Sequence, residues 1–133
     1  MSASYVRAKV EQWCEEVSQV TGEPFYKTIN LDNDPQDPVW WTVEFMSLFS
    51  EGLLCKKNYT ETGVVRVVFI GQPGLGWEDT INALESVIPL LMEKVDPSRR
   101  LELADFEPVV EESLGSAEPN YIVSVSINYL HKL

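Results

Sequence analysis

The chain has 133 residues, of which 44% are hydrophobic and 11% aromatic, and its formal net charge is −11. This length and composition predict a single folded domain spanning residues 1–133, with enough apolar residues for a buried core. The excess of carboxylates repels nucleic-acid backbones and anionic membranes, so we expect specific binding to neither. No apolar run approaches the roughly 20 residues that span a bilayer, and the first residues lack the apolar core of a secretory signal.

Residues 3–21 are predicted to form an amphipathic helix. Apolar residues recur at steps of four and three, as Val6, Val10, Trp13, Val17 and Val20. Charged residues fall off this stripe, so we expect the stripe to pack on a sheet. Gly22 ends the helix and Pro24 prevents its continuation. Cys14 is expected to be a buried free thiol.

A short strand is predicted over Phe25–Leu31, followed by an acidic turn over residues 32–38. The turn lacks the glycine and glutamate of an EF-hand loop, whose places hold Asp37 and Val43, so we interpret it as a solvated loop rather than a calcium site. Val39–Met46 alternates as a strand does. Trp40 and Trp41 therefore point to opposite faces of the sheet, and we expect one in the core and the other under a helix or a partner subunit.

The next two strands, Leu53–Asn58 and Gly63–Ile70, are predicted to pair as a hairpin. The second is apolar on both faces except at Arg66, which is typical of a strand in the interior of a sheet. The glycine-rich segment Gly71–Gly76 has the glycine spacing of a phosphate-binding loop. Its lysine and Ser/Thr positions hold Trp77 and Glu78, so we expect a turn and no bound nucleotide.

A second helix is predicted over Trp77–Val95, kinked by Pro89. Its buried stripe is expected to be Ile81, Leu84, Val87, Ile88, Leu91, Met92 and Val95. Leu101–Phe106 is predicted as a strand and residues 107–120 as an acidic loop. The chain then alternates through a last strand, Tyr121–Leu130, in which Val125 and Ile127 face the core. Together the elements predict an α/β (α+β) fold, with a mixed, largely antiparallel β-sheet and two main helices packed on it.

Residues suited to catalysis are few. The only histidine, His131, lies two residues from the last residue, where side chains are usually mobile. Acidic pairs such as Glu111 and Glu112 are typical of solvated surfaces. We therefore predict no catalytic, metal-binding or cofactor-binding residues, and no enzymatic activity.

Three segments carry a resemblance to a known family. They are the acidic loop and Trp-rich strand DNDPQDPVWWTVEF, the strand, turn and helix VVRVVFIGQPGLGWEDTINALESVIPLLMEKV, and the last strand NYIVSVSINYL. In this order and at this chain length, they resemble the tail terminator (tail-completion) proteins of long-tailed bacteriophages.

The resemblance implies a structural protein of the virion tail, assembled in the host cytoplasm. Copies of such a protein form a ring, usually of six, that caps the head-proximal end of the tail tube. The ring stops tube polymerisation and provides the surface that joins the head. The implied partners are other copies of the chain, the tail tube protein and a head-completion or connector protein. The resemblance implies no cofactor and no catalytic residue.

Two alternatives remain open. A small acidic secretion-type chaperone, binding a protein client, shares the size, the low pI and the mixed α/β content, but such proteins typically close with a helix. A small enzyme or ligand-binding domain is the other.

For a ring-forming subunit, surface aromatics with charged neighbours are candidate contacts, because interface cores favour such residues. The candidate subunit or tube contacts are Trp40, Lys56, Lys57, Tyr59 and Trp77.

Overall fold

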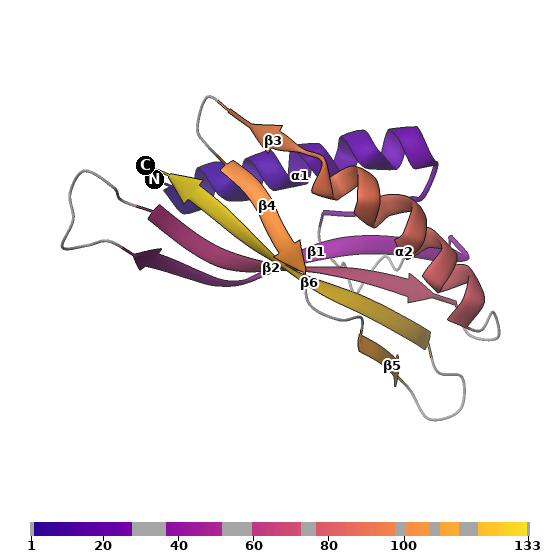
Figure 1. Ribbon diagram of the computed structural model, residues 1–133. Coiled ribbons are helices and arrows are strands. Elements are labelled where there is room, and N and C mark those ends of the chain that lie inside the picture. Colours follow the sequence, from indigo (N-terminus) through magenta and orange to yellow (C-terminus); the bar gives the residue numbers. More distant parts are fainter. Residues whose placement is uncertain are drawn as a thin grey trace.

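The computed structural model describes residues 2–27, 37–51, 60–72, 77–97, 101–106, 110–114 and 120–132. The elements in chain order are α1 (Ser2–Thr21), β1 (Val39–Glu51), β2 (Thr60–Gly71), α2 (Trp77–Met92), β3 (Val95–Asp96), β4 (Leu101–Phe106), β5 (Val110–Leu114) and β6 (Asn120–Lys132). Both helices lie on one side of a single curled sheet (Figure 1). The expected α+β class is confirmed.

The strand order in the sheet is β1-β2-β6-β4-β3, and β5 pairs with β6 as well. Every pairing between these strands is antiparallel. The central strand β2 pairs along its whole length with β1 on one side and β6 on the other. The prediction that Leu53–Asn58 pairs with this strand is therefore wrong, because both sides of β2 are occupied. Residues 53–58 lie outside the described residues.

The acidic stretch before β6 contains a strand that was not predicted. β5 pairs with the first half of β6, from Asn120 to Ser124, and β4 pairs with the second half, from Ile127 to His131. The prediction of an uninterrupted loop over residues 107–120 is therefore wrong. Glutamate has a low intrinsic preference for strands, but pairing with a neighbouring strand overrides that preference.

The main core lies between the sheet and the two helices. From α1, the predicted residues Val6, Val10, Trp13 and Val17 are buried in it. Val20 is 76% exposed, so its predicted burial is wrong. A strict 3.5-residue spacing rotates away from one face of a straight helix by about 20° per heptad, and Val20 lies two heptads after Val6.

α2 contributes Leu84, Val87, Ile88 and Leu91 to the same core, as predicted. The helix ends at Met92, because the amides of Glu93 and Lys94 donate to carbonyls three residues back, at 3.3 and 3.1 Å. Val95 consequently leaves the helical stripe. It belongs to β3 and is 52% exposed, so its predicted place in the buried stripe is wrong.

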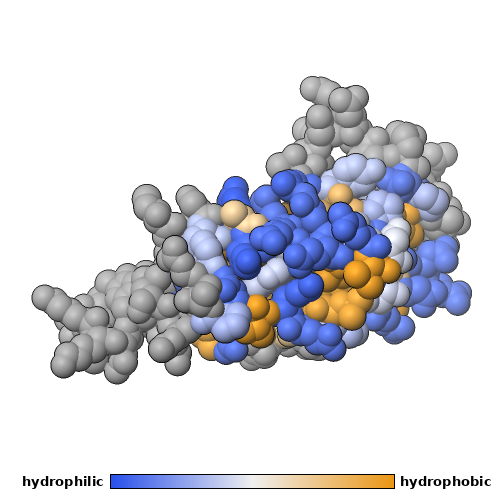
Figure 2. Space-filling view, turned by 90° about the horizontal axis from the view of Figure 1, so that it is seen from above, coloured by the Kyte–Doolittle hydropathy of each residue, from blue (hydrophilic) through white to orange (hydrophobic). Residues whose placement is uncertain are grey.

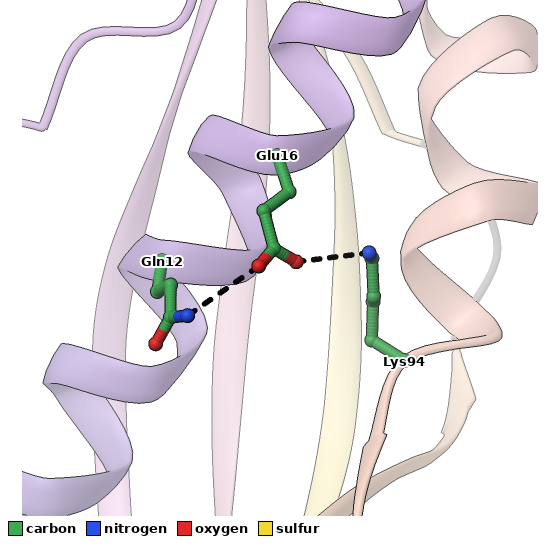
Figure 3. Close-up of polar contacts among 3 residues, drawn as sticks. All are labelled: Gln12, Glu16 and Lys94. Atoms are coloured by element: carbon green, nitrogen blue, oxygen red, sulfur yellow. Dashed lines mark hydrogen bonds and ion pairs between the residues drawn. The ribbon is translucent and has the colours of Figure 1, made fainter.

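A polar contact connects α1 to the end of α2 (Figure 3). The Lys94 ammonium donates to Oε2 of Glu16 at 2.9 Å, and the Gln12 side-chain amide donates to the other carboxylate oxygen at 3.4 Å. The hydrogen bond from Lys94 lowers the pKa of the Glu16 carboxyl below its ordinary value. This contact links α1 to the segment that follows α2.

The two tryptophans of β1 point to opposite faces, as predicted, and both are buried. Trp41 is fully buried in the main core, where its indole N–H donates to the Glu23 carbonyl at 3.0 Å. Trp40 lies on the second face of the sheet. There it forms a smaller buried cluster with Val68, Ile70 and Ile122. Each face of the sheet therefore has its own apolar cluster.

His131 is held in place rather than mobile. Its backbone is paired with Glu61 on one side and with Leu101 on the other. Its imidazole is 1% exposed and stacks on the Tyr5 ring, with the ring centroids 5.5 Å apart. The expectation of a mobile His131 is therefore wrong, since a fully paired strand fixes it. The first part of α1 and the last part of β6 therefore lie close together (Figure 1).

Candidate interaction surface

The candidate surface lies along the outer edge of β1, the first strand in the sheet order. At Trp41 this edge is occupied. The Trp41 N–H donates to the Pro24 carbonyl at 3.0 Å, and the Trp41 carbonyl accepts from the Tyr26 N–H at 3.0 Å. Pro24 has no N–H of its own, so it can contribute only its carbonyl to this edge. The segment after α1 thus covers the first part of β1.

Beyond Trp41 the outer edge of β1 has no partner among the described residues. Backbone groups of a strand alternate in direction, so the N–H and C=O groups of Val43 and Phe45 point away from β2, as those of Trp41 do. Among the described residues, none forms a backbone hydrogen bond with this side of β1 beyond Trp41. A register shift follows between Phe45 and Ser47, and such a bulge bends the strand. We call the short stretch Val43–Phe45 the open edge, because no described residue pairs with its outer side.

A hollow of about 300 Å³ lies beside this open edge. It is lined by Arg7, Glu11, Lys27, Thr42, Val43, Glu44 and Phe45. α1 provides one wall and β1 the other. The hollow gives access to the unpaired backbone groups.

The charged side chains around the hollow make weak contacts within the chain. Lys27 and Glu15 form an ion pair at 3.2 Å, but their side chains are 54% and 49% exposed. The Arg66 guanidinium lies 3.4 Å from a carboxylate oxygen of Glu44. The Arg7 guanidinium lies over the Phe45 ring, 4.9 Å from its centroid. Exposed ion pairs contribute little to stability, so Arg7 and Lys27 can exchange these contacts for contacts with a partner at small cost.

The structure describes only some of the predicted contact residues. Trp40 is 7% exposed and meets the Tyr26 ring edge-on, with the centroids 5.8 Å apart, so it offers little accessible surface. Trp77 is the first residue of α2, and its side chain is outside the described part of the structure. Lys56, Lys57 and Tyr59 lie outside the described residues. Their role as contacts stays a prediction.

A smaller hollow of about 220 Å³ lies on the helix side, where α1 and α2 end. It is lined by Val17, Val20, Leu90, Glu93 and Lys94. Seen from the helix side, the described surface is mostly hydrophilic, with hydrophobic residues gathered in a patch (Figure 2). The exposed Val20 adds apolar area beside this second hollow.

Cys14 is the only described cysteine, and the expected free, buried thiol is confirmed. Burial raises the pKa of the Cys14 thiol far above its ordinary value, and the carboxylates of Glu11 and Glu15 raise it further. The thiol is therefore unreactive in the folded state. In the described part of the chain, no three His, Cys, Asp or Glu side chains gather as metal ligands do. No described helix is long and apolar enough to cross a membrane.

Sequence reasoning predicted β1 but not its place at the edge of the sheet. One signal was available. β2 is apolar on both faces except at Arg66. In β1, apolar residues alternate with the polar residues Thr42 and Glu44, a pattern that is typical of a strand with one face less buried. The approach of Arg7 to the Phe45 ring depends on the packing of α1 and could not be predicted from residue spacing. Searches against protein-family models and against curated proteins both return no match for this chain.

Proposed function

We propose that this chain is a structural subunit that assembles with copies of itself into a ring. In the proposed role, a ring of six subunits caps the head-proximal end of a phage tail tube, stops its polymerisation and presents the surface that joins the head. The protein acts by binding other proteins and not by catalysis. Its partners are other copies of the chain, the tail tube protein and a head-completion or connector protein.

The observation that carries this proposal is the edge of β1 at Val43–Phe45, with which no residue in the described part of the chain pairs. An exposed strand edge is a template for pairing with another chain, so proteins that remain monomeric usually block such edges. Here the edge lies beside a hollow with exposed basic side chains. A subunit that must be soluble alone and pair on assembly needs such a short, accessible edge.

Two further observations support the proposal. The fold has the helices and the sheet that the resemblance implies, with β2 leading towards α2 as the segment containing VVRVVFIG suggests. The net charge of −11 suits a conduit through which DNA passes, because a negatively charged ring does not hold the DNA backbone.

The test combines size-exclusion chromatography with light scattering and negative-stain imaging of isolated tail tubes. We expect a monomer or a ring of about six subunits in solution and a ring at the tube end. A stable dimer that binds no tube end would contradict the proposal and favour the secretion-type chaperone.

The predicted contact residues provide a second test. Tyr59→Ala and Trp77→Ala should leave the circular dichroism spectrum unchanged and reduce ring formation or capping, because aromatic contacts carry much of the binding energy of an interface. Normal capping by both variants would show that these positions lie outside the contact.

A further inference from the structure

We propose that the segment Pro24–Tyr26 is a displaceable strap, which shields the outer edge of β1 at Trp41 and keeps a free copy of the chain from pairing there with another copy. The strap opens at its Tyr26 end while the sheet stays folded. The inference goes beyond the proposed ring, because it concerns a single copy before assembly and holds whatever the chain assembles into.

The strap lies over the edge of β1 and contacts both faces of the sheet. Phe25 forms a parallel bridge with Trp41, whose N–H and C=O groups are bonded to the strap at 3.0 Å each. The Phe25 ring packs on the Trp41 ring on the main-core side, with the centroids 4.7 Å apart. The Tyr26 ring meets Trp40 on the second face. The strap thus occupies the groups that a strand of another copy would use, and such a cover prevents pairing between chains.

The start of the strap is fixed to the end of α1. The Glu23 carbonyl accepts hydrogen bonds from the Ser18 hydroxyl at 2.7 Å and from the Trp41 indole N–H at 3.0 Å. The Glu23 amide donates to the Thr21 hydroxyl at 3.2 Å. Gly22, with a φ of +80°, allows the turn between α1 and the strap without strain. Glu23 is therefore the fixed point from which the strap extends.

The other end of the strap is held by side chains at the surface. Tyr26 is 38% exposed, and its hydroxyl donates to a carboxylate oxygen of Asp37 at 2.5 Å. This hydrogen bond raises the pKa of the Tyr26 hydroxyl above its ordinary value, because the protonated form is the donor. The next residue, Lys27, forms an exposed ion pair with Glu15, and such pairs contribute little. We therefore expect the hydrogen bond between Tyr26 and Asp37 to control opening.

Backbone pairing between the strap and β1 is sparse. Pro24 has no N–H, so it offers β1 one hydrogen bond rather than two. In the described part of the chain the strap forms one bridge with β1, whereas β2 pairs with the inner side of β1 from Val39 to Glu51. Segments with few backbone hydrogen bonds open at a lower free energy than core strands. The outer groups of Trp41 can therefore become free while β1 stays paired with β2.

The first test measures local opening by hydrogen exchange. Tyr26→Phe removes the hydroxyl and keeps the ring, and Asp37→Ala removes the acceptor. Either variant should speed exchange of the Trp41 amide about tenfold, because a hydrogen bond to a charged group is lost. Amides at the centre of β6 should exchange as in the wild type. Tyr5→Phe, which removes a phenol hydroxyl near the start of α1, is the matched control and should leave the Trp41 amide unchanged.

Two results of this test would overturn the proposal. Both substitutions remove the same hydrogen bond, so the double variant should exchange no faster than either single variant. Additive effects would show that this bond does not hold the strap. Exchange of the Trp41 amide at the rate of the β6 amides in every variant would show that the strap opens only when the whole fold unfolds.

The second test asks whether the uncovered edge pairs with another copy. The affinity of a contact is proportional to the fraction of copies that can form it, so Tyr26→Phe should self-associate about tenfold more strongly than the wild type or Tyr5→Phe. Sedimentation equilibrium measures this. The Trp41 amide of the Tyr26→Phe variant should also become protected again at high protein concentration. Fast exchange of this amide at every concentration would overturn the role of the strap in preventing pairing.

These outcomes are separate from those of the proposed ring. If the wild type caps tail tubes but its strap never opens locally, the ring function stands and this inference is wrong. If the strap opens as expected but the wild type caps no tail tube, this inference stands and the ring function is wrong.

Discussion

At the scale of single residues, alternation along β6 determines which side chains are buried. Val125 and Ile127 are 1% and 0% exposed, whereas Ser126 between them is only half-buried. All three lie in the central part of the sheet, where β6 pairs with β2. The prediction that Val125 and Ile127 face the core is therefore confirmed. Substitutions at Ile127 and at Ser126 should consequently change the free energy of unfolding by different amounts.

Ile127→Ala should lower the free energy of unfolding by about 2–5 kcal/mol, because it removes buried methyl groups and leaves a cavity. Ser126→Ala is the matched control and should cost well under this. Urea unfolding followed by fluorescence measures both. Equal midpoints would show that the register of β6 is wrong.

A second prediction concerns Thr42 of β1. Thr42 is 1% exposed, and its hydroxyl has no hydrogen-bond partner among the residues that the structure describes. A buried hydroxyl without a partner is costly, and valine has nearly the same shape. Thr42→Val should therefore leave the free energy of unfolding unchanged or raise it. Val43→Thr is the control, since it places a hydroxyl in the main core and should lower stability; a loss of stability in Thr42→Val would reveal a partner for the hydroxyl.

At the scale of elements, the two helices are joined by packing and by the Glu16–Lys94 contact. Packing dominates, because both apolar stripes are buried in one core. The ion pair is partly exposed, with side chains 44% and 32% accessible, so its contribution is small.

The pH dependence of this contact follows from the lowered pKa of Glu16. A carboxyl with a lowered pKa in the folded state stabilises the fold above its unfolded pKa, and this stabilisation is lost as the pH falls through the folded value. Lys94→Met should therefore cost less than about 1 kcal/mol at neutral pH. The difference from the wild type should shrink on acidification below the ordinary glutamate pKa of 4.5.

Urea unfolding of both proteins across this pH range measures the effect. Glu93→Gln is the control, because it changes charge nearby without touching the pair. If the difference in unfolding free energy between the two proteins stays constant below the ordinary glutamate pKa of 4.5, the Glu16 carboxylate is not the source of that difference.

At the scale of the whole molecule, the net charge of −11 opposes compaction of one copy and association of several. Added salt screens this repulsion over a Debye length of about 10 Å at 0.1 M. We therefore expect the thermal midpoint to rise between about 20 and 200 mM sodium chloride. A midpoint that falls over this range would show that specific ion pairs outweigh the general repulsion.

Several features were determined by the sequence alone. The periodicities of α1, α2, β1, β4 and β6 were sufficient to predict these elements, because the apolar residues that face the main core recur with the period of a helix or of a strand. The opposite directions of Trp40 and Trp41 followed from the same alternation. The two helices and the largely antiparallel sheet could therefore be predicted without a structure.

Only the tertiary structure decided which strands are neighbours and which edges remain open. β5 forms in a stretch of low strand preference because it pairs with β6. β2 pairs with β1 on one side and with β6 on the other, and its own residues do not specify these neighbours. The burial of His131 likewise depends on pairing with β2 and β4. Backbone hydrogen bonds between strands carry no sequence period of their own, so the open edge at Val43–Phe45, and the charges gathered beside it, became visible only once the sheet was assembled.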